Sequence, residues 1–372
     1  MKDNPLRTLG TLGQSIWLDY IRRDLIVSGE LRRLIEEDGL RGMTSNPSIF
    51  EKAIAGSHDY DKDIRGMVLE GKSVNAIYEA LSQRDVQIAA DEFRPLYDRT
   101  EGRDGYVSLE VNPHLAHDTR GTMEEARRLW AAMNRPNVLI KVPATAEGLP
   151  VIQQLISEGI NVNVTLLFGI PRYRQVVEAY LAGIETRATQ AKPVKTVASV
   201  ASFFVSRIDA LVDPLLEECI AQGGREADIA KQVHGQVAIA SAKVAYQIYK
   251  EVFDSDRFRK LADKGALTQR LLWASTGTKN PKYSDVKYIE ALIGRDTVDT
   301  VPVETLDDYR DHGQPQDRIE QEAVKARWVL DRLPELGISI DKVTQQLENE
   351  GVAKFSQSFD KLMDALEKAV QK

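Results

Sequence analysis

The sequence predicts an α/β fold of the (β/α)8-barrel (TIM-barrel) type, in which strands and helices alternate along 372 residues. Eight strand-like runs recur, and each is followed by a helical pattern. No GxGxxG or P-loop glycine fingerprint follows any run, which disfavours an open doubly wound nucleotide-binding sheet. We expect a single barrel domain over residues 1–372, with extra helices after strands two and six. A helical extension over about residues 315–372 is expected to pack on it.

The expected strands are short apolar runs bounded by turn residues. The fourth run places four apolar residues around one lysine, a pattern typical of a strand buried on both faces. The second run is followed by Pro47, which forces the backbone out of the sheet. The eight runs are Ser15–Asp19, Leu40–Thr44, Tyr106–Val111, Asn137–Thr145, Ile160–Phe168, Lys195–Phe204, Arg270–Ser275 and Thr297–Val301.

Helical spacing of apolar residues and capping residues predict the connecting helices. These are Glu30–Asp38, Val74–Tyr97 within a longer insertion, Asp118 or Thr119 to Met133, Leu149–Glu158, Pro171 to about Thr186, two stretches between Arg207 and Phe253, Asp285–Leu292, Asp317–Leu333 and Gln345–Val370. The last two are amphipathic, so we expect them to cover the barrel, with a subunit interface as the alternative.

The charge balance and cysteine content narrow the class of partner. Lys and Arg number 49 against 56 Asp and Glu, a formal charge of −7, and no basic block is present. This argues against nucleic acid as the main partner. One cysteine, Cys219, fits a reducing compartment. The first residues lack the apolar core of a signal peptide, and no run approaches a membrane span, so we expect a cytoplasmic protein without a membrane partner.

Polar residues recur at the carboxyl ends of the predicted strands, where the active sites of barrels lie. They are Asp19, Asn46, Glu110, Lys141, Asn163 with Thr165, Ser202 and Ser275. Each has an ordinary structural explanation when taken alone, such as a helix cap, a turn or a small residue. Because seven successive strands supply such residues at the same end, we expect a central polar cluster.

Lys141 allows two interpretations. A lysine within an apolar strand must keep contact with water or find a partner, since burial of a charge is costly. It could form a structural ion pair with Glu110. It could instead be an amine kept neutral by desolvation, ready to attack a carbonyl and form a Schiff base. The fourth strand by itself leaves both open.

Four motifs resemble those of the transaldolase family, the Schiff-base transferases of the pentose phosphate pathway. They are Thr44–Phe50 (TSNPSIF), Val107–Val111 (VSLEV), Leu139–Thr145 (LIKVPAT) and Asn163–Phe168 (NVTLLF). The resemblance covers most of the first 300 residues. The chain length and the helical tail resemble the longer bacterial branch of the family.

The resemblance implies a mechanism for transfer of a dihydroxyacetone unit. Lys141 would attack C2 of a ketose phosphate as a neutral amine, which requires its pKa to be lowered by burial. Glu110 and Thr165 would hold a water that relays protons during imine formation. Asp19 would take the proton of the C4 hydroxyl. No metal or organic cofactor is implied, because the imine is the electron sink.

The resemblance also implies the substrate-binding residues. Asn46, Asn163 and Ser202 would hydrogen-bond the hydroxyls of the three-carbon fragment. Arg207 resembles the phosphate-binding arginine of the family, and its fork suits bidentate contacts.

At the end of strand seven the sequence departs from the family. Many members have an arginine within two residues of the serine at the end of that strand, whereas here Ser275 leads to Lys279. Lys279 would have to act from a longer loop. The expected partners are a ketose donor and an aldose acceptor, both phosphorylated, and the chain itself would be a monomer or a homodimer.

Three alternatives remain to be weighed against this interpretation. His114 and His117 form an HxxH pattern, but no third ligand is evident for a metal. A plain aldolase that releases dihydroxyacetone is the nearest rival; such relatives tend to have glutamine in place of Glu110 and tyrosine in place of Phe204. A non-catalytic sugar-phosphate-binding barrel would be favoured if the lysine or the carboxylates were replaced, and all are present.

Overall fold

A computed structural model describes residues 4–371, and eight parallel strands close into a barrel in chain order. The first strand pairs with both the second and the eighth, which closes the sheet and confirms the predicted (β/α)8 fold. The strands are β1 (Gln14–Asp19), β2 (Gly42–Thr44), β3 (Tyr106–Glu110), β4 (Val138–Pro143), β5 (Val162–Leu167), β6 (Ser199–Phe204), β7 (Arg270–Ala274) and β8 (Thr297–Val301).

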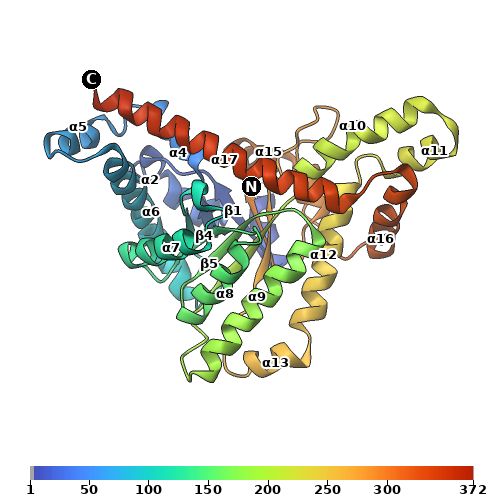
Figure 1. Ribbon diagram of the computed structural model, residues 1–372, viewed down its shortest axis with the longest axis horizontal. Helices are drawn as coiled ribbons and strands as arrows, with labels where there is room; N and C mark the ends of the chain where they lie inside the picture. Colours follow the sequence, from blue (N-terminus) through green and yellow to red (C-terminus); the bar gives the residue numbers. More distant parts are fainter. Residues whose placement is uncertain (1–3, 372) are drawn as a thin grey trace.

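Helices surround the barrel and extend beyond it on one side, where α10 and α11 form an arm (Figure 1). The expected insertions follow β2 and β6. The helices are α1 (Pro5–Thr11), α2 (Arg23–Val27), α3 (Glu30–Arg33) with the π-helix η1 (Leu34–Asp38), α4 (Pro47–Ala55), α5 (Asp61–Leu69), α6 (Val74–Arg99), η2 (Pro113–Leu115), α7 (Thr119–Met133), α8 (Gly148–Glu158), α9 (Ile170–Thr189), α10 (Ser206–Gln222), α11 (Gly224–Val233), α12 (Val237–Phe253), α13 (Asp256–Ala262), α14 (Lys287–Ala291), α15 (Val303–His312), α16 (Ala323–Arg332), η3 (Leu333–Leu336) and α17 (Ile340–Val370).

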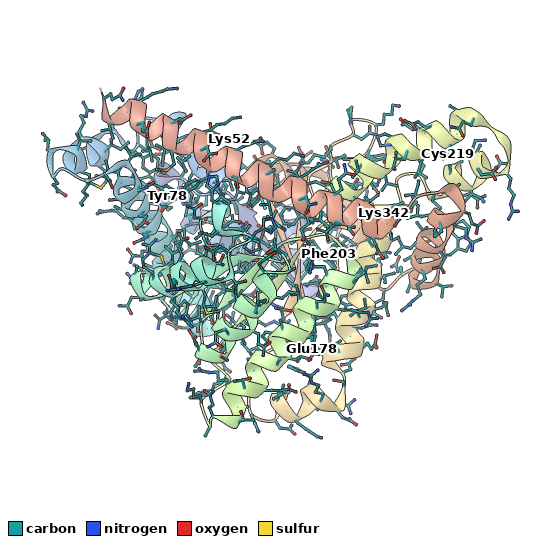
Figure 2. All side chains as sticks on the ribbon, in the orientation of Figure 1. Lys52, Tyr78, Glu178, Phe203, Cys219 and Lys342 are labelled. Carbon is teal, nitrogen blue, oxygen red and sulfur yellow. The ribbon has the colours of Figure 1, made fainter. Side chains whose placement is uncertain are left out.

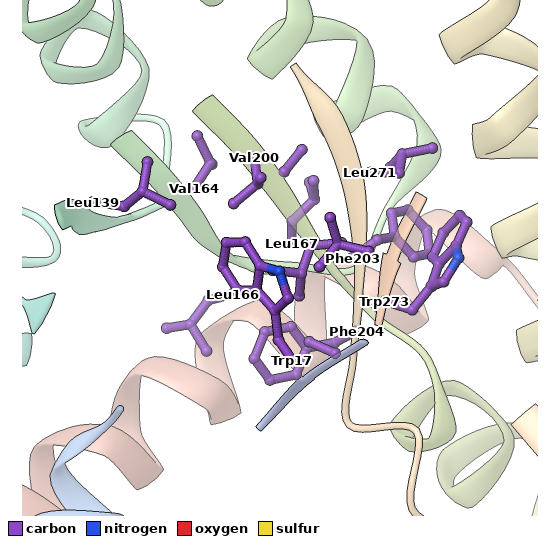
Figure 3. Packing of buried hydrophobic residues seen from close by; sticks show 14 of the residues in the cluster. Trp17, Leu139, Val164, Leu166, Leu167, Val200, Phe203, Phe204, Leu271 and Trp273 are labelled. Atoms are coloured by element: carbon purple, nitrogen blue, oxygen red, sulfur yellow. The ribbon is translucent and has the colours of Figure 1, made fainter. Parts of the chain in front are cut away.

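The barrel interior is filled by large side chains below the carboxyl end of the strands (Figure 3). Trp17 is fully buried, and its indole lies against Gly42 of the neighbouring strand. A Cβ atom at Gly42 would come within 2.4 Å of that indole, so only glycine leaves room for the tryptophan at this level of the barrel. On the helix-facing side of β7, Trp273 packs edge-on against Phe203, with ring centroids 6.3 Å apart.

A charged cluster closes the amino end of the barrel. Arg270 of β7 donates to Ser15 over 2.9 Å and pairs with Asp104 over 3.1 Å. Burial raises the pKa of Asp104, but Arg270, Ser15 and Arg41 outweigh burial and hold that pKa below its ordinary value. The cluster and the core above it leave the carboxyl end as the side from which a ligand reaches the barrel centre.

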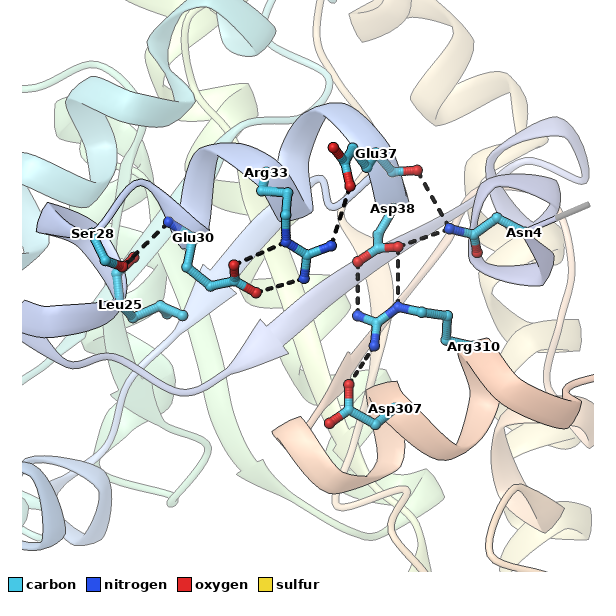
Figure 4. A network of polar contacts seen from close by, with 9 residues as sticks. All are labelled: Asn4, Leu25, Ser28, Glu30, Arg33, Glu37, Asp38, Asp307 and Arg310. Carbon is cyan, nitrogen blue, oxygen red and sulfur yellow. Dashed lines mark hydrogen bonds and ion pairs between the residues drawn. The ribbon is translucent and has the colours of Figure 1, made fainter. Parts of the chain in front are cut away.

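A second polar network joins the first and last units of the barrel (Figure 4). Arg310 of α15 contacts both carboxylate oxygens of Asp38, over 3.1 and 2.7 Å. Asn4, the N-cap of α1, donates to the same carboxylate over 2.7 Å. Residues from α1, η1 and α15 therefore share one buried carboxylate, which fixes the two ends of the barrel sequence against each other.

The long helix α17 crosses the carboxyl end of the barrel, as expected for a cover (Figure 1). It packs against α4, α6 and β5. Glu348 accepts two hydrogen bonds from Arg172 at the start of α9, over 3.1 and 3.3 Å. Asp360 pairs with His114 over 2.7 Å. One contact lies in the first half of α17 and the other in its second half, and together they hold the helix over the strand ends.

Two features of the sequence-based prediction differ from the structure. Three helices, not two, lie between residues 206 and 253, because Gly223 and Gly224 break the first stretch with positive φ angles of 77° and 82°. The helix expected from Asp317 begins only at Ala323. The residues before it form a turn in which the N–H groups of Arg318 and Ile319 both donate to Ile293 O.

Within the described residues, none of the helices combines the length and the apolarity needed to cross a membrane. Cys219 lies on α10 in the arm that projects from the barrel (Figure 2). It is partly buried and stands apart from the strand ends. A partly buried position on a helix is typical of a packing residue.

Asp299 of β8 provides a test of the buried structure. Burial raises the pKa of its carboxyl group to about 8, although Thr276 donates a hydrogen bond to it over 2.8 Å. The folded protein therefore binds a proton that the unfolded chain releases near pH 4, and stability is lost as pH rises from about 4 to about 8. Asp299→Asn should remove this loss. The fall in Tm between pH 5.5 and 8.5 should shrink by roughly 2 to 5 °C.

The measurement is thermal unfolding of both proteins at the two pH values. Asp256→Asn, at a side chain that is 87% exposed, serves as the control and should leave the pH dependence unchanged. An equal fall in Tm for wild type and Asp299→Asn would contradict a protonated Asp299 in the folded state.

Candidate active site

Lys141 lies at the centre of the candidate site, on β4 and inside the barrel. Its Nζ atom donates to the backbone oxygen of Ser45 over 2.9 Å and pairs with Glu110 Oε2 over 3.2 Å. Glu110 and Lys141 are direct neighbours in the β3–β4 register. The lysine is only 5% exposed. An ammonium group has three N–H donors, and these two contacts use two of them. The ion pair with Glu110 that the sequence suggested is present. A reactive amine would occupy the same position, so the ion pair does not exclude the Schiff-base interpretation.

Glu110, the last residue of β3, pairs with the lysine but does not line the cavity that holds it. Burial raises the pKa of Glu110 to about 7, and the neighbouring Lys141 acts in the opposite direction. A carboxyl group with this pKa can both donate and accept a proton near neutral pH. Glu110 also lines a second cavity of about 460 Å³, together with Tyr78 and Phe359.

Asp19 is the last residue of β1 and lines the cavity together with Lys141. Thr44 Oγ1 donates to Asp19 Oδ1 over 2.6 Å, and Thr300 Oγ1 lies 2.7 Å from the same threonine hydroxyl. Burial raises the pKa of Asp19, while Lys141 and the hydrogen bond from Thr44 lower it. The β1–β2 register places Thr44 beside Asp19, so local pairing orients the carboxylate. A carboxylate with a raised pKa is a better proton acceptor than an exposed one.

The side chains of β5 and β6 form a buried polar chain. Ser202 donates to Asn163 Oδ1 over 2.6 Å, and Asn163 donates to Ser108 over 3.0 Å. The hydroxyl of Thr165 is buried without a hydrogen-bond partner among the described residues. An unsatisfied buried hydroxyl is costly, which is an argument for a ligand or water at this point.

A β-bulge shapes the end of β5 beside the site. The β5–β6 register shifts between Val164 and Leu167, and Leu166 has a positive φ angle of 56°. Bulges turn side chains at the rims of barrels, and this one follows Thr165 directly. The aromatic ring of Phe168, just beyond the strand, packs on Phe204 with centroids 5.0 Å apart.

A cavity of about 390 Å³ opens at the carboxyl end of the strands. The residues predicted from sequence that line it are Asp19, Asn46, Lys141, Thr165, Ser202, Phe204, Arg207, Ser275 and Lys279. Glu110 and Asn163 do not line it but contact residues that do. Residues that line it without having been predicted include Thr44, Lys52, Thr300 and Phe355. The strand-end cluster expected from the sequence is therefore one site.

Asn46 is the N-cap of α4 and also lines the cavity. Its side-chain oxygen accepts a hydrogen bond from the N–H of Ile49 over 3.1 Å, which caps α4. Its side chain also lines the cavity. Since capping uses only the oxygen, the amide N–H₂ group is available to a ligand.

Cations surround the outer part of the cavity. Arg207 begins α10, Lys279 lies in the loop after β7, and Lys52 lies on α4 beside α17 (Figure 2). No carboxylate among residues 4–371 pairs with any of the three. Burial and the nearby Arg207 lower the pKa of Lys279, so the two cations destabilise each other. A bound dianion such as a phosphate group would relieve that repulsion.

Ser275 lines the same cavity. It follows β7 directly and has a positive φ angle of 56°. Its hydroxyl is 3.1 Å from that of Ser206 at the start of α10. A role for Ser275 in binding a ligand stays a prediction.

The two histidines of the HxxH pattern have other partners. His114 pairs with Asp360 of α17 and packs on Phe359, and His117 pairs with Glu147 over 3.0 Å. Within residues 4–371, no group of histidine, cysteine or acidic residues could hold a metal ion.

The fold and the site define a class of protein: a (β/α)8 barrel with a buried lysine that pairs with one carboxyl group and shares its cavity with another, an arrangement suited to Schiff-base chemistry. The family model described as Transaldolase/Fructose-6-phosphate aldolase matches residues 16–366. The chain belongs to this family.

Similar proteins match over their whole length. A protein of Trichodesmium erythraeum named Transaldolase is 48% identical over 376 residues, covering 100% of this chain and 99% of that protein. One of Nostoc sp. named Transaldolase 2 is 46% identical over 376 residues, with the same coverage. One of Saccharopolyspora erythraea named Transaldolase is 46% identical over 362 residues, covering 97% of this chain and 96% of that protein.

Proposed function

We infer that the chain is a transaldolase. It transfers a dihydroxyacetone unit reversibly from sedoheptulose 7-phosphate to glyceraldehyde 3-phosphate, giving erythrose 4-phosphate and fructose 6-phosphate. The full-length likeness to proteins named Transaldolase supports this activity. The observation that carries the mechanism is the position of Lys141, buried and 3.2 Å from Glu110 in a cavity that also contains Asp19.

The first step forms the Schiff base. Neutral Lys141 attacks C2 of the ketose phosphate, and the C2 oxygen is then lost as water. The protons required move through a water held by Glu110 and Thr165. The pKa of Glu110, near 7, suits transfer in both directions, and the unpartnered hydroxyl of Thr165 can hydrogen-bond that water.

The second step breaks the bond between C3 and C4. Asp19 takes the proton of the C4 hydroxyl, and C4 becomes the aldehyde carbon of the departing aldose phosphate. The electron pair of the broken bond moves into the iminium group and leaves an enamine on Lys141. A second aldose phosphate then accepts the three-carbon unit by the reverse sequence. No metal or organic cofactor is needed, since the iminium ion accepts the electron pair.

Two polar residues bind the three-carbon fragment, and a third orients one of them. Asn46 and Ser202 line the cavity and would hydrogen-bond its hydroxyl groups. Asn163 accepts the hydrogen bond of Ser202 and so acts by orienting that serine. Phe204 closes the cavity wall beside them.

The phosphate group is bound by Arg207, Lys279 and Ser275, with Lys52 as a further cation at the same rim. Arg207→Ala should raise KM for both donor and acceptor by roughly 10- to 100-fold, because a hydrogen-bonded charge pair is lost. The rate at saturation should change less, since Lys141, Glu110 and Asp19 are untouched. Initial rates over a range of each substrate measure the effect.

Arg225→Ala, at a side chain that is 82% exposed on α11, serves as the arginine control. An Arg207→Ala enzyme with wild-type KM for both substrates would remove Arg207 from the phosphate site.

The second candidate function is an aldolase that releases free dihydroxyacetone. Glu110 and Phe204 are the residues that the resemblance associates with transfer, and the named relatives favour the transferase. The discriminating experiment supplies fructose 6-phosphate with and without erythrose 4-phosphate. A transaldolase produces sedoheptulose 7-phosphate with the acceptor and little free dihydroxyacetone without it. Rapid release of dihydroxyacetone without an acceptor would identify the aldolase.

The barrel and the C-terminal helices are proposed to form one domain. The support is the packing of α17 on α4, α6 and β5, together with its charged contacts to α9 and η2. A cytoplasmic location is also proposed, on the basis of the single cysteine and the metabolic substrates.

A further inference from the structure

The C-terminal helix contributes an aromatic side chain to the cavity. Phe355 of α17 lines the cavity together with Lys141, and the Nζ atom lies 5.8 Å from the centroid of its ring. The side chain is partly buried and packs against the core. A cation at this distance from an aromatic ring is within the range of a favourable cation–π contact. The ring therefore covers the reacting nitrogen from the side of α17.

Contacts on both sides of Phe355 fix the position of the ring. Glu348 is held by Arg172 and Asp360 by His114, so the helix is anchored before and after this residue. Gly351, one turn earlier, lies against Leu166 at the end of β5, and a Cβ atom there would be 3.0 Å from that leucine (Figure 3 shows Leu166 beside the α17 ribbon). The close approach of α17 to β5 brings Phe355 over the lysine.

We propose that Phe355 is a specificity-determining residue, which shields the lysine-bound three-carbon fragment from water and so makes transfer prevail over release. The proposal rests on the proposed function. After the first aldose phosphate leaves, the enamine must persist until an acceptor enters. The wall formed by Phe355 is apolar, whereas the phosphate end of the cavity is cationic. The ring thus blocks the entry of further water from the side of α17, while the route for the acceptor stays polar.

The competing reaction consumes one water. The enamine carbon takes up a proton to give the iminium ion, water adds at C2 and gives up a proton, and the C2–Nζ bond breaks. The nitrogen keeps the bonding electron pair and, with the protons returned to it, leaves as the lysine amine, while the C2 hydroxyl loses its proton to become a carbonyl. Enamine and water thus give lysine amine and dihydroxyacetone. Removing the ring should accelerate this reaction more than it affects transfer.

The test compares Phe355→Ala, Phe355→Val and Phe355→Leu. For each variant, release of dihydroxyacetone from fructose 6-phosphate without acceptor is measured against transfer to erythrose 4-phosphate. The ratio of release to transfer should rise at least about 10-fold in Phe355→Ala, because the ring no longer blocks water; this corresponds to about 1.4 kcal/mol in activation free energy. Phe355→Val should raise the ratio by an intermediate factor. Phe355→Leu retains the cover and should stay near the wild-type ratio.

Leu362→Ala is the matched control on the same helix. Leu362 is fully buried and does not line the cavity, so its truncation weakens the packing of α17 without opening the site. Its ratio of release to transfer should equal that of wild type. In D₂O, Phe355→Ala should also place deuterium on the released dihydroxyacetone faster than wild type, a signature of enamine protonation that lost stability alone does not produce.

An unchanged ratio in both Phe355→Ala and Phe355→Val would overturn the proposal. An equal rise in Leu362→Ala would also overturn it, since helix packing and not the ring would then control release. Failure of the proposed function gives a different result, because wild-type protein would then show no transfer to erythrose 4-phosphate at all.

Discussion

Lys141→Ala should abolish transfer, with a fall in kcat/KM on the order of 10⁴-fold or more, because no covalent intermediate can form without the amine. The other lysines of the cavity, Lys52 and Lys279, lie at its outer rim and do not replace it. Initial rates of transfer from sedoheptulose 7-phosphate to glyceraldehyde 3-phosphate measure the effect.

The protein should remain folded in spite of this change. Glu110 loses its cationic partner, but Lys141 is the group that lowers the pKa of Glu110 against the effect of burial. Without the lysine that pKa rises further above about 7, so the carboxyl group takes up a proton and no uncompensated charge remains. Circular dichroism and Tm provide the check. Lys243→Ala is the matched control, since Lys243 is a buried lysine of α12 that donates to Arg318 O and Gln321 O, outside the cavity. It should keep wild-type kcat/KM per folded molecule. A folded Lys141→Ala protein with measurable Schiff-base turnover would remove Lys141 from the mechanism.

Asp19→Asn should give the second largest loss, a fall in kcat of roughly 10²- to 10⁴-fold, as expected when a general base is removed. The amide oxygen can still accept the hydrogen bond from Thr44, so the local geometry is retained. Imine formation does not depend on Asp19 and should persist. The variant should therefore accumulate the intact six-carbon imine from fructose 6-phosphate, which borohydride reduction and mass spectrometry detect.

Asp299→Asn is the control for this second prediction. It makes the same change of a buried carboxyl group to an amide, on β8 and outside the cavity lining. Its kcat should be that of wild type. A three-carbon adduct that forms at the wild-type rate in Asp19→Asn would show that another group takes the C4 proton.

The barrel could be predicted because each strand is marked by local sequence. Short apolar runs and their turn residues lie within a few positions of one another, and the eight predicted runs overlap the eight strands. The short helices α1, α2 and α13 were not predicted, since 5 to 7 residues give little periodicity. The start of α16 was placed too early, because the turn before it depends on hydrogen bonds to the distant Ile293 O.

The candidate site was predictable to the extent that the barrel topology places the strand ends together. Asp19 and Glu110 end their strands, and Lys141 lies two residues before the end of β4, so their proximity follows from the fold. Whether a strand-end residue lines the cavity or stands behind it depends on side-chain packing, which the sequence does not give. Asn163 is the example, since it contacts Ser202 and does not line the cavity.

Residues supplied by distant elements were missed. Phe355 comes from a helix more than 200 residues after Lys141 in the sequence, and its contact depends on how α17 docks. A signal was present in the sequence: Gly351 interrupts the apolar face of the predicted last helix, and a helical glycine often marks a close approach to another element. Thr44 lies inside one of the quoted motifs and could have been selected by its place beside Asp19 in the sheet.

The most direct test of the central claim is borohydride trapping with fructose 6-phosphate, followed by peptide mass spectrometry. The account predicts a reduced adduct of dihydroxyacetone size on Lys141, which reports both the nucleophile and cleavage between C3 and C4. A folded protein that binds sugar phosphate but carries no adduct on Lys141 would contradict the account.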